Sequence, residues 1–307
     1  MSRLLRKSCS MLSTSSGAIK ASLKPMVKSL GDGFTVRRAL PFVSQRSVGP
    51  WVFFDHFGPV DYDPGEGMDV RPHPHIGIAT VTYLFEGEIW HRDSLGNSMP
   101  IHPGAINLMV TGNGMVHSER TRDTLRAEGY RLHGLQLWLA LPDHEEERDA
   151  SFHHHPADTI PVRALPNGAN IRIMMGSAFD LTSPVETFSE TVYYEVDLPD
   201  GATIDLPSAT EAAIYVVEGA LEIGDATSDP FILSVLTPGE HPVTARGRTR
   251  FAVVGGDPVG KRFMKWNFVS SRRERIRKAA EAWRNGDFPT VPGDESDFIP
   301  LPETMVF

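Results

Sequence analysis

Two short pairs of metal-binding side chains occur in the first half of the chain. His73 and His75 form the first pair, and His117 and Glu119 form the second, with one residue between the partners of each pair. In a β-strand this spacing places both side chains of a pair on the same face. Two such strands inside a barrel would bring three imidazoles and one carboxylate to one point. This donor set suits a first-row transition metal and leaves coordination positions open, so the sequence predicts one metal site.

The sequence around these pairs predicts strands. From Phe34 onward, short runs rich in β-branched and aromatic residues alternate with turn signals made of Gly, Pro, Asn and Asp. Residues 80–85, 106–110 and 135–141 are three such runs. Many short strands with closely spaced turns are typical of an all-β sandwich or barrel.

The second half of the chain repeats the layout of the first. Residues 215–223 resemble residues 83–89, and the Thr-Pro-Gly turn at 237–239 resembles the His-Pro-Gly turn at 102–104, at nearly the same offset. This similarity predicts an internal duplication of one β domain. Adding the same offsets to the residue numbers of the four candidate ligands gives positions that hold no comparable set of metal ligands. We therefore expect the second copy to have a structural role. Those positions are Asp205, Pro207, Ala252 and Val254.

We expect three segments along the chain. Residues 1–31 contain no Asp or Glu and are rich in Ser, Lys and Arg, which is typical of a basic disordered arm, an over-extended start or an organellar targeting segment. Residues 32–155 form the metal-binding domain, and residues 156–307 form the second domain. One helix is predicted at about 272–285, because a capping-box pattern begins at Ser271 and Gly286 is placed to end it. A Pro-rich tail follows this helix.

Composition narrows the class of protein. The net charge is −9, which argues against direct nucleic-acid binding. No run of 18 apolar residues is present, so no membrane-spanning segment is expected. The single cysteine, Cys9, excludes an intrachain disulfide and indicates a reducing compartment. We therefore expect a cytoplasmic protein, or an organellar one if residues 1–31 are a transit peptide.

Several motifs resemble the pirin family of bicupins, and the resemblance extends over roughly residues 30–303. It implies two tandem cupin, jelly-roll-like β-barrel domains with one C-terminal helix. The chain departs from many pirins at two positions. Ile76 follows the second histidine where many pirins have Arg, which predicts a different charge at the mouth of the site. Ala79 stands where many pirins have a glutamate, but that glutamate is not a metal ligand. The motifs that carry the resemblance are 72–77, 83–87, 91–96, 103–104, 112–119 and 266–271.

The resemblance implies that His73, His75, His117 and Glu119 bind Fe(II), although Mn, Co, Ni, Cu or Zn would fit the same donors. It also implies a metal-dependent dioxygenase of the quercetin 2,3-dioxygenase type. Such an enzyme cleaves a flavonol or related enolisable aromatic with O2, and Glu119 would accept the proton of the substrate hydroxyl. The alternative is a non-catalytic, metal-dependent regulatory protein that acts through a protein partner.

Other conspicuous residues receive weaker roles. Adjacent strand residues point to opposite faces, so the run His153–His155 is expected at an exposed loop or edge and not at a metal. Residues 53–57, which include three Phe and one His, would either roof an aromatic pocket or pack in the core. His91 and Asp93 are expected on an outer strand or turn.

Overall fold

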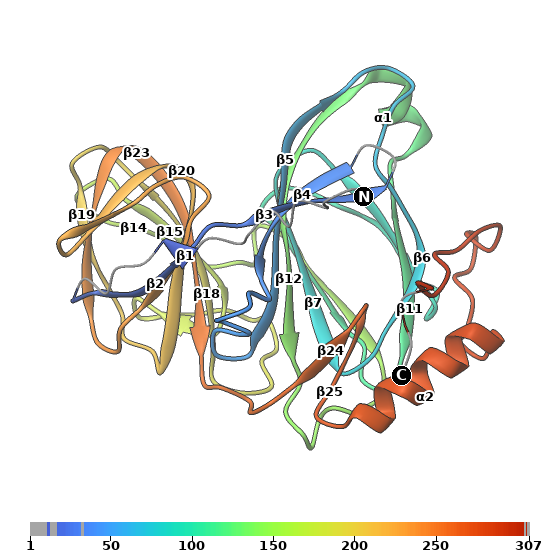
Figure 1. The fold of residues 1–307 in the computed structure, drawn as a ribbon. Helices are drawn as coiled ribbons and strands as arrows, with labels where there is room; N and C mark the ends of the chain where they lie inside the picture. The colour runs from blue at the N-terminus through green and yellow to red at the C-terminus, as the bar shows by residue number, and fades with distance from the viewer. Residues whose placement is uncertain (1–10, 13–16, 32–33, 304, 306–307) are drawn as a thin grey trace, which may run out of the picture.

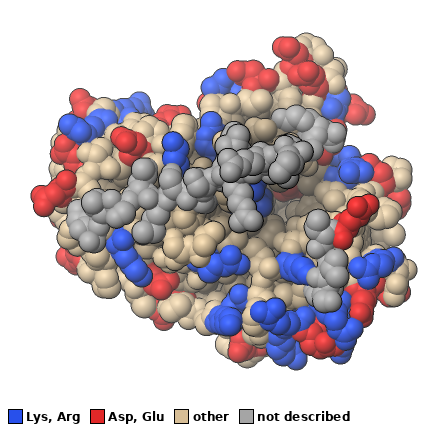
Figure 2. Space-filling view, viewed as in Figure 1, with Lys and Arg blue, Asp and Glu red and all other residues tan. Residues whose placement is uncertain are grey.

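The computed structural model describes residues 11–12, 17–31, 34–303 and 305, and it consists of two β-sandwich domains that lie side by side (Figure 1, Figure 2). This architecture confirms the predicted all-β fold with a C-terminal helix. A short second helix, α1 (Asp123–Glu128), was not predicted. None of the described helices is both long and apolar enough to cross a membrane.

The N-terminal domain packs a seven-stranded sheet against a four-stranded sheet. The strand order in the large sheet is β13-β10-β7-β12-β5-β4-β3, and in the small sheet it is β6-β11-β8-β9. The large sheet comprises β3 (Met26–Gly31), β4 (Phe34–Leu40), β5 (Trp51–Tyr62), β7 (Ile78–Glu86), β10 (Ile106–Val110), β12 (Tyr130–Ala140) and β13 (Ser151–His155). The small sheet comprises β6 (Asp69–His75), β8 (Ile89–Asp93), β9 (Ser98–Ile101) and β11 (Met115–Arg120).

The second domain repeats this topology strand for strand. The strand order that corresponds to the large sheet of the first domain is β2-β22-β20-β23-β18-β15-β14. In addition, β19 pairs with β23 as β6 pairs with β11, and β21 pairs with β20 as β9 pairs with β8. These matching orders agree with the predicted duplication. The strands are β1 (Met11–Leu12), β2 (Ile19–Leu23), β14 (Val162–Ala164), β15 (Asn170–Met175), β16 (Ser177–Ala178), β17 (Leu181–Thr182), β18 (Thr191–Leu198), β19 (Thr203–Leu206), β20 (Glu211–Ile223), β21 (Ala226–Ser228), β22 (Leu233–Leu236) and β23 (His241–Gly256).

The topology corrects the residue-by-residue mapping of the duplication. The strands that correspond to β6 and β11 are β19 and the first part of β23, which pair with each other. Their buried side chains are apolar and belong to the core of the second domain, except for His241, whose Nε2 atom lies 2.6 Å from the carbonyl oxygen of Thr237. The predicted equivalents Ala252 and Val254 lie instead in the later part of β23, opposite β20 and β18. The apolar residues are Ile204, Leu206, Val243 and Ala245.

The N-terminal segment is more ordered than its composition suggests. Residues 19–23 form β2, which pairs with β22 of the second domain, and Ile19 and Leu23 are fully buried there. Residues 26–31 form β3 at the edge of the large sheet of the first domain. Residues 1–10 and 13–16 of the predicted arm lie outside the described residues. The domain boundary at residues 155 and 156 stays a prediction.

The C-terminal segment returns to the N-terminal domain. The hairpin β24 (Phe263–Lys265) and β25 (Phe268–Ser270) leads into α2 (Arg273–Asn285), and Ile76 bridges to Phe268. Gly286 ends α2 in a left-handed conformation, as predicted. The capping box was wrong: Arg272 is the N-cap residue and makes no side-chain cap bond. The Ser271 hydroxyl instead donates to the buried Glu146, 2.8 Å away.

Candidate metal centre

The two predicted ligand pairs lie on neighbouring strands of the small sheet. β6 carries His73 and His75, β11 carries His117 and Glu119, and the two strands pair in antiparallel fashion with His117 directly opposite His73. Directly opposed residues share a face of the sheet. The strands are therefore adjacent in one sheet and do not face each other across the interior of a barrel. A bulge between His117 and Glu119 shifts the register, so that Glu119 lies opposite Val70.

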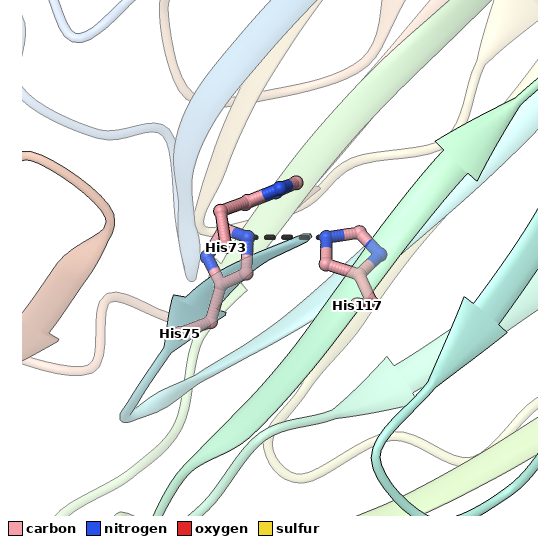
Figure 3. Close-up of side chains that lie close together, drawn as sticks. All are labelled: His73, His75 and His117. Carbon is pink, nitrogen blue, oxygen red and sulfur yellow. Dashed lines mark hydrogen bonds between the residues drawn. The ribbon is translucent and has the colours of Figure 1, made fainter. Parts of the chain in front are cut away.

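The three histidines converge on one point (Figure 3). The Nε2 atoms of His75 and His117 are 3.2 Å apart, and the ring of His73 lies 4.4 Å from that of His117. One ligand atom from each residue lies within 4.8 Å of the other two. His73 Nδ1 is 2.8 Å from the carbonyl oxygen of Arg71, which fixes the proton on Nδ1 and leaves Nε2 free to bind a metal.

Burial keeps this triad in the form that binds metals. All three side chains are buried, and burial lowers the pKa of His73 to about 4 and the pKa values of His75 and His117 well below the usual range. Neutral imidazoles have the free lone pair that a metal needs. Two nitrogens each about 2.1 Å from a shared ion would be 3.2 Å apart at an angle of roughly 100°. The His75–His117 separation therefore fits a first-row metal.

Glu119 lies in the same pocket but outside the tight triad. Its Oε1 atom is buried without a hydrogen-bond partner among the described residues. Burial raises the pKa of Glu119 to about 7. Contact with Thr82 acts in the opposite direction, and its effect on the pKa is smaller. A buried carboxylate without a compensating positive charge is costly. A cation held by the triad would supply that charge.

The triad lies in a cavity of about 500 Å³ with mostly aromatic and aliphatic walls. This size is within the usual range for small-molecule sites. The rings of Trp138 and His75 make an edge-to-face contact, with their centroids 5.0 Å apart. The ring of Trp138 also stacks on the ring of Phe53, with their centroids 3.8 Å apart. The apolar part of the lining comprises Met26, Leu30, Phe34, Val36, Pro41, Phe53, Phe57, Met68, Val70, Ile89, Trp138, Met264, Trp266 and Ile299.

The side chains of residues 53–57 point alternately to the two faces of β5, so this aromatic motif has two roles. Phe53, Asp55 and Phe57 line the cavity of the triad. Phe54 faces the other way, into the core shared by the two domains, and His56 contacts Tyr215 of the second domain. Both interpretations of this motif, an aromatic pocket wall and core packing, therefore apply to alternate residues.

Two expectations about the surroundings of the site were wrong. Ile76 does not line the cavity, because it points to the opposite face and packs against α2, so its identity has no direct effect on the charge at the mouth. His91 and Asp93 are buried next to the ligands, since they pair with Glu119 and His117 across β8 and β11. Asp93 also accepts bonds from the backbone of Leu95 and Asn97, which builds the turn after β8.

The run His153–His155 lies in β13, which is an edge strand of the large sheet, as expected. Among the described residues, these histidines join no group of three or more potential metal ligands.

Sequence reasoning missed several residues that shape the cavity. Gln136 accepts a hydrogen bond of 2.9 Å from Thr82, the residue that also contacts Glu119. Met264 and Trp266 reach the cavity from the C-terminal hairpin, and Ile299 reaches it because its amide donates to the carbonyl oxygen of Pro72. These contacts join segments far apart in the chain, and no local pattern in the sequence marks them.

The tandem cupin-like domains, with one histidine centre in the first, define a bicupin. Family models agree with this class: "Pirin" matches residues 33–139, and "Pirin C-terminal cupin domain" matches residues 193–289. A pirin-like protein from Caulobacter vibrioides is 43% identical over 280 residues, which cover 90% of this chain and 96% of that protein. The chain belongs to the pirin family.

Solved structures show the same architecture. The crystal structure of a quercetin 2,3-dioxygenase from Acinetobacter baumannii is similar with a TM-score of 0.84 at 31% identity, over 93% of this chain and 96% of that one. A bacterial pirin from Escherichia coli, solved in complex with nickel(II), has a TM-score of 0.59 at 18% identity, over 76% of this chain and 96% of that one. The second similarity shows a shared fold.

Proposed function

We propose that this protein is a metal-dependent dioxygenase of the quercetin 2,3-dioxygenase type, which cleaves a flavonol or a related enolisable aromatic with O2. The observation that carries the proposal is the buried triad of His73, His75 and His117 at the wall of an aromatic-lined cavity. The similarity to the Acinetobacter baumannii enzyme supports the choice of substrate class.

In this proposal the three histidines hold one metal and Glu119 is the fourth ligand. Fe(II) is the preferred ion, and Mn, Co, Ni, Cu or Zn suit the same donors. The metal would supply Lewis acidity toward a substrate oxygen and the electronic coupling that O2 chemistry requires.

Glu119 is the proposed proton acceptor. An enolic hydroxyl entering the cavity must lose its proton before its ring can react with O2, and Glu119 is the carboxyl group that lines the cavity beside the triad. A metal would also make the bound hydroxyl more acidic, so a carboxylate is a strong enough base to take its proton. Thr82 donates a hydrogen bond to Gln136 and also contacts Glu119, so these two residues border the carboxylate that would take the proton.

The cavity walls bind and orient the ring system. Phe53 and Trp138 form a stacked pair with rings 9° from parallel, which gives the cavity a rigid aromatic wall next to His75. Contact with the edges of such a wall favours an aromatic substrate. The same walls exclude water from the reacting atoms.

The test uses quercetin added first without oxygen and then with air. Anaerobic addition to metal-loaded protein is expected to shift the absorption band of quercetin, because the substrate oxygen binds at the metal. Air is then expected to bleach the band, with O2 uptake and release of carbon monoxide. The regulatory alternative predicts the shift without bleaching, together with recovery of a specific protein partner that depends on the metal.

A further inference from the structure

We propose that Lys28 selects substrates with an anionic group, a carboxylate or an ionised phenol, at the end remote from the triad. This inference rests on the proposed function and names its substrate class more narrowly. It is carried by the position of Lys28 on the edge strand β3, at the wall of the triad cavity.

Strand pairing directs the Lys28 side chain toward the cavity. Alternate residues of β3, namely Met26, Lys28 and Leu30, line the cavity, whereas Val27 between them is 72% exposed. Lys28 is paired with Val36 on β4, and Val36 is paired with Phe57 on β5. Directly paired residues share a face, and both of these partners line the cavity.

Lys28 is the positively charged residue of this wall whose charge is not balanced by a neighbouring carboxylate. Arg38, two pairs along the ladder, binds Asp55 through two hydrogen bonds of 2.8 and 2.7 Å and stacks 4.3 Å above the ring of Phe53. That pair is neutral overall. Lys28 takes part in the backbone ladder, but its side chain has no ion pair or hydrogen bond with any residue that the structure describes. Its charge nevertheless acts on this wall, because it lowers the pKa of Asp55 against the larger raising effect of burial.

This arrangement gives the cavity two chemically different ends. At one end the triad takes a chelating oxygen, and at the mouth an exposed ammonium faces the same apolar space. A flat aromatic with its chelating oxygen at the triad would direct its far ring toward the mouth. An anionic group on that ring would pair with Lys28, and partly exposed ion pairs of this kind change affinity by about fivefold.

The test compares two ligands that differ by one charge. The probes are 3-hydroxyflavone and its 4′-carboxylate, and the protein is loaded with Zn(II), which has no redox chemistry and so prevents turnover. Binding is followed by quenching of the intrinsic fluorescence, to which Trp138 and Trp266 in the cavity wall contribute. The variants are Lys28→Gln and Lys28→Glu, and Lys24→Gln is the matched control because Lys24 is exposed and does not line the cavity.

We expect native protein and Lys24→Gln to bind the carboxylate about fivefold more tightly than the neutral compound, and we expect 0.5 M salt to reduce the difference. Lys28→Gln should remove the preference and Lys28→Glu should reverse it, with affinity for the neutral compound unchanged. An equal preference in native protein and Lys28→Gln would overturn the role of Lys28 while leaving the proposed function intact. Failure of both compounds to bind in a metal-dependent way would instead overturn the proposed function, and this inference with it.

Discussion

His117 lies directly opposite His73 in the antiparallel ladder of β6 and β11, and this pairing sets the geometry of the metal centre. A slip of one residue in the register would turn one strand's ligands to the outer face of the sheet. The bulge after His117 changes the register at Glu119. The site therefore depends on the hydrogen-bonded register of two strands as much as on the identity of its ligands.

Replacing one histidine of the triad is expected to abolish metal binding. His75→Ala removes a donor whose Nε2 is 3.2 Å from that of His117, and the remaining pair would hold the ion far more weakly. Purified native protein should contain close to one equivalent of a first-row metal by elemental analysis, and the variant should contain less than about a tenth of that. His154→Ala is the matched control, because His154 lies on the exposed edge strand β13. Full occupancy in His75→Ala would contradict the assignment.

Glu119→Gln is expected to separate proton transfer from metal binding. Glutamine keeps the size and one oxygen of the side chain but cannot accept the substrate proton. Loss of a general base typically lowers turnover by about 10²–10⁴-fold. We expect quercetin bleaching to fall by this order while the three histidines still hold most of the metal. Gln136→Glu would add a carboxyl group on the same wall, and partial recovery in the double variant would support the role of Glu119. Unchanged turnover in Glu119→Gln would exclude Glu119 as the base.

A second buried histidine pair predicts a dependence of stability on pH. The Nε2 atoms of His56 and His133 are 2.7 Å apart, and His56 Nδ1 lies 3.0 Å from the hydroxyl of Tyr215 in the other domain. Burial lowers the pKa of His133 to about 4 and that of His56 well below its usual range. The charged groups that also act on this pair are Arg37, Glu86, Arg131 and Arg250.

The sign of the effect follows from proton binding. Below about pH 6.5 the unfolded chain protonates these histidines, whereas His133 in the folded protein stays neutral until about pH 4. The free energy of unfolding should therefore decrease as pH falls through this window, by up to about 1.4 kcal/mol per pH unit for each proton. His133→Gln should be less stable than native protein at pH 7, and this difference should shrink toward pH 4. His144→Gln is the control at an exposed position and should change the free energy of unfolding little, and a constant difference for His133→Gln across this window would refute the prediction.

The local parts of this architecture were predictable from the sequence. Spacings of two residues identified the ligand pairs at 73–75 and 117–119, because a strand turns alternate residues to one face. Gly286 marked the end of α2, because only a residue that tolerates a positive φ angle fits there. In both cases the physical cause lies within a few residues of the sequence.

The parts that failed depend on contacts between distant segments. The capping box at Ser271 failed because Glu146 competes for its hydroxyl from 125 residues away. The arm at 19–23 is ordered because β22 offers an edge for it to pair with, and composition does not report this. Lys28 and Ile299 reach the cavity from the two ends of the described chain, so no motif near the ligands could have indicated them.

Trp51→Phe is expected to loosen the two domains from each other. The indole nitrogen of Trp51 donates to the carbonyl oxygens of Val192 and Gly255, at 3.2 and 3.1 Å, and the ring is fully buried in the core that both domains share. Phenylalanine would leave these carbonyl groups without their donor, at a cost of about 1–3 kcal/mol.

Denaturant unfolding of the native protein should be cooperative, because this shared core couples the domains, and the variant should unfold earlier with a broader or biphasic transition. Trp90→Phe is the control, because Trp90 lies on β8 of the small sheet, is only half-buried and donates to the exposed Ser98. It should change the midpoint little. If Trp51→Phe kept both the midpoint and the sharpness of the native transition, the coupling between the domains would have to come from the remaining apolar contacts of the interface.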